Sequence, residues 1–375
     1  MSWEKVRWRD VLNIYNGKNQ SKVVNPNGRY PIYGSGGLMG YSDDFLCPAE
    51  TTIIGRKGSI NNPIFVNTEF WNVDTAFGLV AKEGLLPKYL YYFCKTFNFL
   101  KLDKSTTLPS LTKSDLLEIE IPLPPLPIQE KIAAILDKAD ALRRKDQELL
   151  KKYDELAQAI FIDMFGDPVK NEKGWEVKSI DQLVTKERHS IKRGPFGGAL
   201  KKEIFVQSGY LVYEQYHALN NDFSKERYFI AEDKYKELIA FKVLPKDIII
   251  SCSGVYLGKL AVVPDNAKAG IINQALLKIT LNENIMKNDF FVFHFSQQNF
   301  REKYFDANRG AGIPNFPPMS EFKRFPFICP PIHLQEEFAK KIELINQLKA
   351  QTNAEKSEEL FQSLLQRAFK GELVR

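Results

Sequence analysis

The chain has 375 residues, of which 44% are hydrophobic and 26% charged, and its 52 Lys and Arg against 46 Asp and Glu give a net charge of +6. A chain of this length accommodates two domains, each able to bury its own core, and the composition is that of a soluble globular protein. The small positive excess permits a polyanionic partner but does not by itself indicate one.

The cysteines and histidines form no metal-binding pattern. Four cysteines are scattered without a Cys-x-x-Cys pair, and no histidine lies near them at the spacing of a zinc site. Scattered thiols in a chain of this length fit a reducing cytosol. The N-terminus, MSWEKVRWRD, lacks the apolar segment of a signal peptide, and no stretch reaches the ~18 apolar residues of a membrane-spanning helix. We therefore expect a cytoplasmic protein that binds neither a metal nor a membrane.

The first domain is predicted at residues 1–125, where short apolar runs alternate with turn signals. This pattern indicates a mixed α/β domain in which strands dominate. The clearest runs are 30–33 (YPIY), 51–54 (TTII) and 63–66 (PIFV). A basic turn follows the second run; such a turn is most often simply solvated, and the alternative is that it contacts a nucleic acid. The candidate contacts are Arg56, Lys57, Ser59 and Asn61.

A long helix is predicted at residues 126–166. Pro127 suits its first turn, and Gly166 and Pro168 end it. Apolar residues recur along it at alternating spacings of four and three, the pattern of a coiled-coil seam. A helix of ~38 residues is ~57 Å long, which exceeds the width of a ~120-residue domain. It therefore packs on its own domain only in part, and we expect its main partner to be a second long helix, antiparallel to it.

The second domain is predicted at residues 167–327, with strands near 210–213, 247–250 and 259–263. Its residues 188–202 form a basic, glycine-containing loop that is flexible enough to follow a phosphate backbone. The candidate phosphate contacts in this loop are Arg188, Lys192, Arg193, Lys201 and Lys202. Amide side chains bond adenine edges bidentately, and the candidates for base contacts are Gln215, Asn273 and Gln274.

The second long helix is predicted at residues 328–375. It repeats the apolar spacing of the first helix, except that its centre at residues 352–357 is polar and weakens the seam. The residues predicted to hold the helix pair together are Leu142, Leu149 and Leu156 in the first helix and Phe338, Ile345 and Leu360 in the second.

The chain repeats itself. Residues 122–130 (PLPPLPIQE) match residues 328–336 (ICPPIHLQE) at an offset of 206, and a long helical segment follows each motif. Weaker matches lie upstream in the same order: Trp3-Glu4 with Trp175-Glu176, Ile53-Ile54 and Gly58 with Ile249-Ile250 and Gly254, and Ala76 with Ala275. An ordered series of this kind predicts an α+β chain built as a tandem repeat of domain and helix, with approximate two-fold symmetry.

No catalytic motif is found in the sequence. Residues 254–260 are one residue short of a P-loop and lack the Ser or Thr after the lysine. Gly-x-Ser-x-Gly, His-Glu-x-x-His, the methyltransferase tetrapeptide Asn/Asp-Pro-Pro-Tyr/Phe and a nuclease carboxylate set do not occur. A non-catalytic DNA-binding chain is therefore favoured, and the alternatives are a DNA-modifying enzyme acting alone and a coiled-coil interaction protein.

Taken together, these features resemble the DNA specificity subunit of type I restriction–modification enzymes. The resemblance covers essentially the whole chain. It is carried by the tandem order, the PLPPLPIQE motif, and the segments 30–37 (YPIYGSGG), 53–58 (IIGRKG), 74–77 (DTAF), 194–197 (GPFG), 247–250 (DIII) with 253–254 (SG), and 273–274 (NQ).

The resemblance implies a division of labour. The two domains would be target recognition domains, each reading one half of a bipartite, asymmetric site in double-stranded DNA. The two helices would pair antiparallel and dock two modification subunits. Those subunits would bind S-adenosylmethionine and methylate adenine, and separate restriction subunits would use ATP and Mg to cut unmodified DNA. This chain would then hold no cofactor and would itself catalyse nothing.

Overall fold

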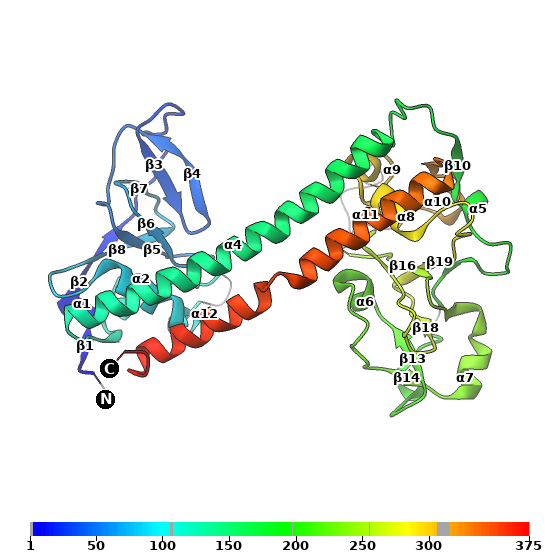
Figure 1. Cartoon of the computed structure of the whole chain (residues 1–375). Helices are drawn as coiled ribbons and strands as arrows, with labels where there is room; N and C mark the ends of the chain where they lie inside the picture. Colours follow the sequence, from blue (N-terminus) through cyan, green and yellow to red (C-terminus); the bar gives the residue numbers. More distant parts are fainter. Residues whose placement is uncertain (1–2, 106–107, 197, 255, 306–315, 375) are drawn as a thin grey trace. The chain divides into compact units, whose positions relative to one another are not determined.

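The computed structural model describes the chain except residues 1–2, 106–107, 197, 255, 306–315 and 375, so Gly197 of the basic loop lies outside the described residues. The chain divides into two compact units, Met1–Leu150 with Thr352–Arg375 and Lys151–Gln351. One long helix, α4 (Leu126–Phe165), contributes residues to both units (Figure 1). The α+β class predicted from the sequence is confirmed.

Unit 1 is built on a four-stranded sheet in the order β2-β8-β5-β6, a three-stranded sheet β4-β3-β7 and a two-stranded ribbon β1-β9. Its elements before α4 are β1 (Lys5–Arg7), α1 (Trp8–Val11), β2 (Leu12–Asn16), β3 (Tyr30–Gly34), β4 (Gly37–Ser42), β5 (Thr51–Gly55), β6 (Ile64–Val66), β7 (Trp71–Asn72), β8 (Ala76–Ala81), α2 (Pro87–Thr96), η1 (Phe99–Leu102), α3 (Lys113–Leu117) and β9 (Glu120–Pro122). Its last helix is α12 (Ala354–Phe369). The core joins one face of the larger sheet to α2, the first part of α4 and α12.

Unit 2 follows the same plan with a four-stranded sheet β11-β19-β16-β17, a five-stranded sheet β12-β14-β13-β18-β15 and a ribbon β10-β20. Its elements after α4 are β10 (Val177–Ser179), α5 (Ile180–Leu183), β11 (Ile191–Arg193), η2 (Lys202–Ile204), β12 (Phe205–Val206), β13 (Tyr210–Tyr213), α6 (Gln215–Asn220), β14 (Phe229–Ile230), α7 (Glu232–Glu237), η3 (Ile239–Phe241), β15 (Lys242–Val243), β16 (Ile248–Ser251), β17 (Leu260–Val262), β18 (Gly270–Ile272), β19 (Leu276–Ile279), α8 (Asn288–Ser296), α9 (Gln298–Tyr304), α10 (Met319–Phe322), β20 (Pro326–Ile328) and α11 (Ile332–Gln351). All strands predicted in this region are present.

The strand registers show that the two units are repeats of one another. Ile54 pairs with Phe77 in unit 1, and Ile250 pairs with Leu277 in unit 2. At one turn of each unit a glycine approaches a backbone carbonyl so closely that a Cβ on Gly17 or Gly194 would lie 1.8 Å from that oxygen. The same turns donate equivalent backbone hydrogen bonds, from Gly17 to Ala76 and from Gly194 to Leu276. Ala76 therefore matches Leu276, one residue beyond the predicted Ala275.

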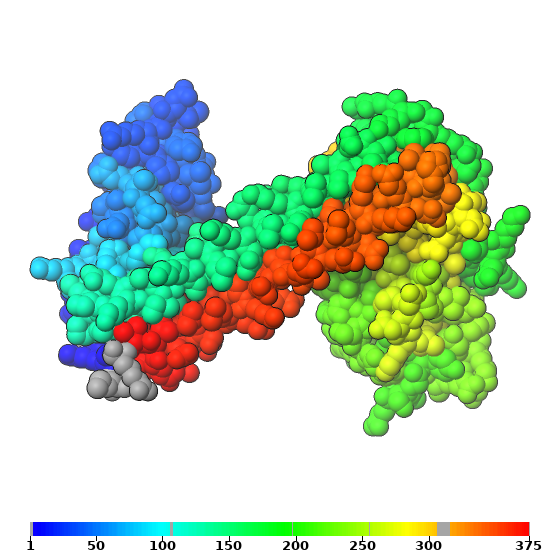
Figure 2. All heavy atoms as spheres, in the orientation of Figure 1, coloured from blue at the N-terminus to red at the C-terminus, as the bar shows by residue number. Residues whose placement is uncertain are grey.

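The long helices pair in reversed order within each unit. In unit 1, Arg143 of α4 reaches Glu358 of α12 at 3.1 Å. In unit 2, Asp154 of α4 pairs with Lys349 of α11, and further along α4 Met164 accepts from Lys341 at 3.7 Å. Residue numbers that rise along one helix thus fall along its partner, as in an antiparallel pair (Figures 1 and 2).

The predicted seam of this pair is displaced by one residue. Leu142, Leu149, Leu156 and Leu360 are 40–47% exposed, whereas Leu136, Ala157 and Phe161 are buried against the partner helices. One residue turns a helix by about 100°, so the heptad chosen from leucines lies on the neighbouring face. The packed face of α4 in unit 1 carries the charged residues Arg143 and Asp140 at its centre. The leucine pattern therefore did not predict this face. Of the residues predicted in the second helix, Phe338 and Ile345 do lie in the core of unit 2.

The predicted second helix is also interrupted. α11 ends at Gln351 and α12 begins at Ala354, with Thr352 and Asn353 outside both. Asn353 has a backbone ψ of 27° and accepts a hydrogen bond from the amide of Ser357, so it ends one helix and starts the next. Thr and Asn are weak in helix interiors and favourable at helix ends. The polar centre recognised in the sequence is therefore a helix break.

Candidate nucleic-acid interface

The basic turn of unit 1 is a rigid loop at the end of β5. The amides of Arg56 and Lys57 both donate to the carbonyl of Thr75, at 2.8 and 3.2 Å. Gly58 holds a φ of +77°, which favours glycine. Arg56, Lys57 and Ser59 are exposed, and the Arg56 guanidinium lies 5.8 Å from the Phe77 ring. A fixed backbone thus presents two cations to solvent.

Asn61, also predicted as a DNA contact, is an anchor of this loop. Its Oδ1 accepts the amide of Phe99 at 2.7 Å, and its Nδ2 donates to Asn98 at 2.9 Å. These bonds tie the loop to η1 and occupy both ends of the carboxamide. Asn61 therefore ties the loop to η1, and its predicted contact with DNA stays a prediction.

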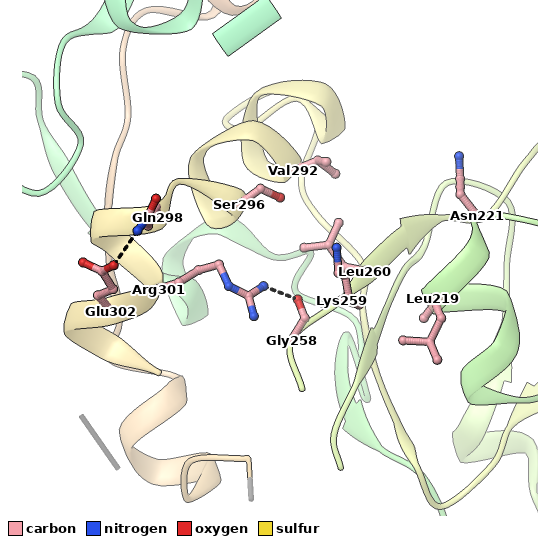
Figure 3. A pocket seen from close by; sticks show the side chains of 11 residues that line it. Leu219, Asn221, Gly258, Lys259, Leu260, Val292, Ser296, Gln298, Arg301 and Glu302 are labelled. Carbon is pink, nitrogen blue, oxygen red and sulfur yellow. Dashed lines mark hydrogen bonds between the residues drawn. The ribbon is translucent and has the colours of Figure 1, made fainter. Parts of the chain in front are cut away.

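The equivalent loop of unit 2, residues 251–258, is anchored by a different residue. Arg301 of α9 donates to the carbonyl of Gly258 at 3.0 Å (Figure 3). It also donates to the carbonyl of Leu257 at 2.7 Å. Gly254 has a φ of +75°, as Gly58 has in unit 1. The cavity beside this anchor is about 580 Å³ and is lined by residues of α6, α8 and α9. The loop of unit 1 is therefore anchored by the segment that follows α2, and the loop of unit 2 by the equivalent segment that follows α8.

The predicted basic loop at residues 188–202 is in part a strand. Residues 191–193 form β11, in which Lys192 lies opposite Lys278 and Arg193 opposite Leu277. Because side chains alternate along a strand, Lys192 and Arg193 point to opposite faces of the sheet. Lys192 lies 4.9 Å from the Phe241 ring, and Arg193 lies 5.2 Å from the Phe196 ring. The prediction that residues 188–202 form one flexible loop is therefore wrong at residues 191–193, while phosphate contact by Lys192 or Arg193 stays a prediction.

The remaining cations of this segment are freely placed for contact. Arg188 lies in the turn before β11, and Lys201 and Lys202 lie at the start of η2; all three are exposed. Arg188, together with Lys192 and Lys278, lowers the pKa of His189 by charge repulsion, after the larger effect of desolvation. A positive potential at this edge of unit 2 follows from these charges.

The predicted amide contacts divide into two kinds. Gln215 donates from Nε2 to Ser251 and to the carbonyl of Ser253, at 2.5 and 2.6 Å, so its amine is already occupied. Asn273 accepts the amide of Ala275 through Oδ1 at 3.0 Å, which forms the turn before β19. Gln274 is exposed at the tip of that turn. Of the three residues, Gln274 is therefore the best placed to reach a base edge.

Two exposed aromatic residues were not predicted as part of this surface. Phe196 is 66% exposed after β11, and Tyr256 is 57% exposed in the loop that matches the basic turn of unit 1. Phe196 belongs to the GPFG segment, and an aromatic residue between glycines in a basic loop was a signal that the sequence offered. Such rings can stack on an arginine or contact a base.

The described residues hold no group of three or more His, Cys, Asp or Glu placed to bind a metal, and all four cysteines are free thiols. The buried ion pair of Lys278 with Asp247, at 3.3 Å, lies inside the four-stranded sheet, where Thr280 also donates to the carboxylate. Among the helices of the described chain, none is both long and apolar enough to cross a membrane.

Comparisons with known proteins agree with one another. The sequence model of the type I restriction modification DNA specificity domain matches residues 1–152 and 172–362. The type I restriction enzyme MjaIX specificity subunit of Methanocaldococcus jannaschii is 27% identical over 76% of this chain and 67% of its own length. The MjaVIII specificity subunit of the same organism is 23% identical over 80% of this chain and 76% of its own length.

Solved structures show the same fold. The S subunit of a type I restriction–modification system from M. genitalium superposes with a TM-score of 0.60 at 17% identity, covering 98% of this chain and 96% of that one. A chain from a study of complex assembly and conformational transition of the type I R-M system gives a TM-score of 0.51 at 16% identity, covering 99% and 98%.

Proposed function

Because the chain belongs to the family of type I restriction modification DNA specificity domains, we propose that it selects the DNA site of a type I restriction–modification complex by reading two half-sites, one with each unit. The observation that carries this proposal is the repeated sheet end. Both units present a loop at the same position of the same sheet, anchored on the same side, with exposed cations beside it. The exposed residues differ between the units, so the two half-sites differ and the whole site is asymmetric.

The phosphate contacts proposed for unit 2 are Arg188, Lys201 and Lys202, and for unit 1 Lys57. Each lies exposed at a sheet end or at the edge beside it. A lysine that neutralises a phosphate releases counterions, so its loss reduces the salt dependence of binding by about one unit of slope. Ser59 is exposed two residues after Lys57. Its hydroxyl can donate a hydrogen bond to a phosphate oxygen, as serine hydroxyls commonly do.

The long helices are proposed to dock two modification subunits, one on each unit. Leucines remain exposed on the helices of both units: Leu142, Leu149 and Leu360 in unit 1, and Leu156 and Leu344 in unit 2. Exposed apolar residues clustered on a helix mark surfaces for protein partners. S-adenosylmethionine, ATP and Mg are expected in the partner subunits, since this chain shows no motif for them. Restriction subunits would join the same cytoplasmic assembly.

The test of site selection uses the chain co-expressed with modification subunits of a type I restriction–modification system. The assembled complex is incubated with random duplex DNA, and the bound fraction is sequenced. We expect two short, different half-sites separated by bases without preference. Methyl transfer by the chain alone would indicate the stand-alone enzyme, and a complex that forms but retains no DNA sequence would indicate an interaction protein.

The test of docking is the mass of the assembled complex, where two modification subunits per chain are expected. Leu142→Asp with Leu149→Asp should weaken assembly, and Lys145→Asp, an exposed change on the same helix, serves as the control. A one-to-one complex, or equal assembly by the two variants, would contradict the proposed docking.

A further inference from the structure

In each unit an arginine lies beside the same position of the central strand, but the two units supply it from different neighbouring strands. In unit 1, the central strand β8 holds Phe77, which lies opposite Asn16 of β2 and next to Arg56 at the end of β5. In unit 2, the central strand β19 holds Leu277, which lies opposite Arg193 of β11. The strand orders β2-β8-β5 and β11-β19-β16 are equivalent.

The backbone fixes which residues correspond. Arg56 donates its amide to the carbonyl of Thr75 at 2.8 Å, and Cys252 donates its amide to the carbonyl of Ala275, also at 2.8 Å. Cys252 of unit 2 therefore occupies the place of Arg56. By the register of β2 and β11, Arg193 occupies the place of Asn16. Unit 1 thus has asparagine and arginine at the two positions beside the central strand, and unit 2 has arginine and cysteine.

Both arginine side chains lie on the same face of their sheets. Arg56 lies over the ring of Phe77, which belongs to the core of unit 1. Arg193 shares its face with Leu277 and Ile191, which belong to or pack on the core of unit 2. Cys252 is in that core as well and is fully buried. Each guanidinium therefore emerges at the end of an apolar face, beside the same residue of the central strand.

Among the residues that the structure describes, no acid is paired with either guanidinium. Within the described part of the chain, Arg56 and Arg193 have no ion-pair partner, and the Nε atom of Arg193 is buried without a hydrogen-bond partner. Each instead lies near an aromatic ring, Phe77 at 5.8 Å or Phe196 at 5.2 Å. Burial raises the pKa of Cys252 to about 12, so its thiol stays neutral beside the arginine. The charge at this point of unit 2 comes from Arg193.

From this exchange we infer that Arg56 and Arg193 are one recognition element, supplied from different strands, and that each reads a guanine edge in the half-site of its own unit. The inference rests on the proposed function. A guanidinium has a planar fork that bonds guanine O6 and N7 together, which a lysine does not reproduce. The ring beside each arginine limits its rotation, and the freely exposed lysines nearby suit phosphates.

The first test replaces each arginine by lysine in the assembled complex and selects its site from random DNA. Arg56→Lys and Arg193→Lys keep the positive charge, so a mere phosphate contact would survive with its salt slope unchanged. We expect each variant to lose discrimination about 5- to 100-fold at one G·C pair, in a different half-site for each. Lys131→Arg, an exposed lysine of α4 with no proposed contact to DNA, serves as a control that leaves both half-sites unchanged.

The second test moves the arginine within unit 1. The double variant Asn16→Arg, Arg56→Cys recreates the arrangement of unit 2, and we expect it to recover preference for the guanine that Arg56→Cys alone loses. Thermal unfolding establishes that each variant is folded. If the wild type selects a bipartite site and both lysine variants keep it intact, the inference fails and the proposed function stands. If the wild type selects no site, the proposed function itself fails.

Discussion

The two units repeat the side chains at the junction between sheet and long helix, but they do not repeat the side chains at the end of the sheet. At the junction the two units use the same residue: Gln129 accepts the amide of Leu86 at 2.8 Å, and Gln335 accepts the amide of Lys287 at 2.9 Å. The amine of each glutamine also bonds two carbonyls, those of Gly84 and Pro124 in unit 1 and the equivalent pair in unit 2. At the sheet end the backbone repeats and the side chains do not.

This difference separates two physical demands. A fully buried carboxamide must satisfy every donor and acceptor around it, so few other side chains fit its place. At the sheet end the backbone hydrogen bonds hold the loop, so the side chains can differ: Arg56 is exposed, whereas Cys252 is buried. Arg56 is matched by Cys252, and the anchor Asn61 is replaced by Arg301. The junction therefore preserves its residues and the sheet end is free to change what it reads.

The largest effect is expected from removing a junction glutamine. Gln129→Ala leaves the amide of Leu86 and two buried carbonyls without partners, and each unsatisfied group costs about 1–3 kcal/mol. We expect unfolding of the chain in urea to show a loss of about 3 kcal/mol or more, and a similar loss for Gln335→Ala. Lys131→Ala, an exposed change two residues away, is the control. Equal stability of Gln129→Ala and Lys131→Ala would show that the junction is not held in this way.

A second variant tests a feature that only unit 2 possesses. Lys278 and Asp247 are buried together, whereas the position of Lys278 is Gly78 in unit 1. Lys278→Met leaves a buried carboxylate without its cation, which typically costs about 3–5 kcal/mol. Lys192→Met, at the register partner on the next strand, is the matched control because Lys192 is half-buried and lies over a ring. The same loss in both variants would mean that the buried pair contributes nothing beyond a surface lysine.

A third comparison tests the displaced seam. Leu136 is fully buried against α12, so Leu136→Ala should cost about 2–5 kcal/mol. Leu142 is 47% exposed on the same helix, and Leu142→Ala should cost less than about 1 kcal/mol. Urea unfolding of both variants measures the difference. A larger loss for Leu142→Ala would return the seam to the face predicted from the sequence.

Features that depend on a local sequence pattern could be predicted, whereas features that depend on distant partners could not. The repeat, the strands and α4 follow from motifs and spacings: a helix was predicted at residues 126–166, and α4 spans Leu126–Phe165. The seam was missed because leucine content favoured Leu142 and Leu149, while the packed face carries Arg143. The anchoring role of Asn61 was not predicted because its partners lie 37 and 38 residues away, where local reasoning does not reach. The exchange of Arg56 and Arg193 needs strand register, which spacing alone does not provide.

The helices that follow the junctions offer a last contrast. Leu86 and Lys287 are the N-cap residues of α2 and α8. Counted from these caps, Phe93 of α2 matches His294 of α8. His294 is fully buried and accepts the amide of Ile328 at 3.2 Å through Nε2. In unit 1 the residue that matches Ile328 is Pro122, which has no amide proton to donate. A ring that accepts stands where a donor exists, and a phenyl ring stands where none does.

This pairing predicts a small, pH-dependent effect. Burial lowers the pKa of His294 to about 3, while an unfolded histidine titrates near 6.5. The contribution of His294 to the free energy of unfolding is therefore complete above pH ~6.5. It is lost as the pH falls toward 3, by up to about 1.4 kcal/mol per pH unit. His294→Phe should remove this slope and, at pH 7, cost about 1–3 kcal/mol because the amide of Ile328 loses its acceptor. Adding Ile328→Pro removes the donor as well, so the double variant should regain part of that loss. Unfolding free energies at pH 5 and pH 7 measure both effects, and a double variant less stable than His294→Phe would show that the two positions do not act as a pair.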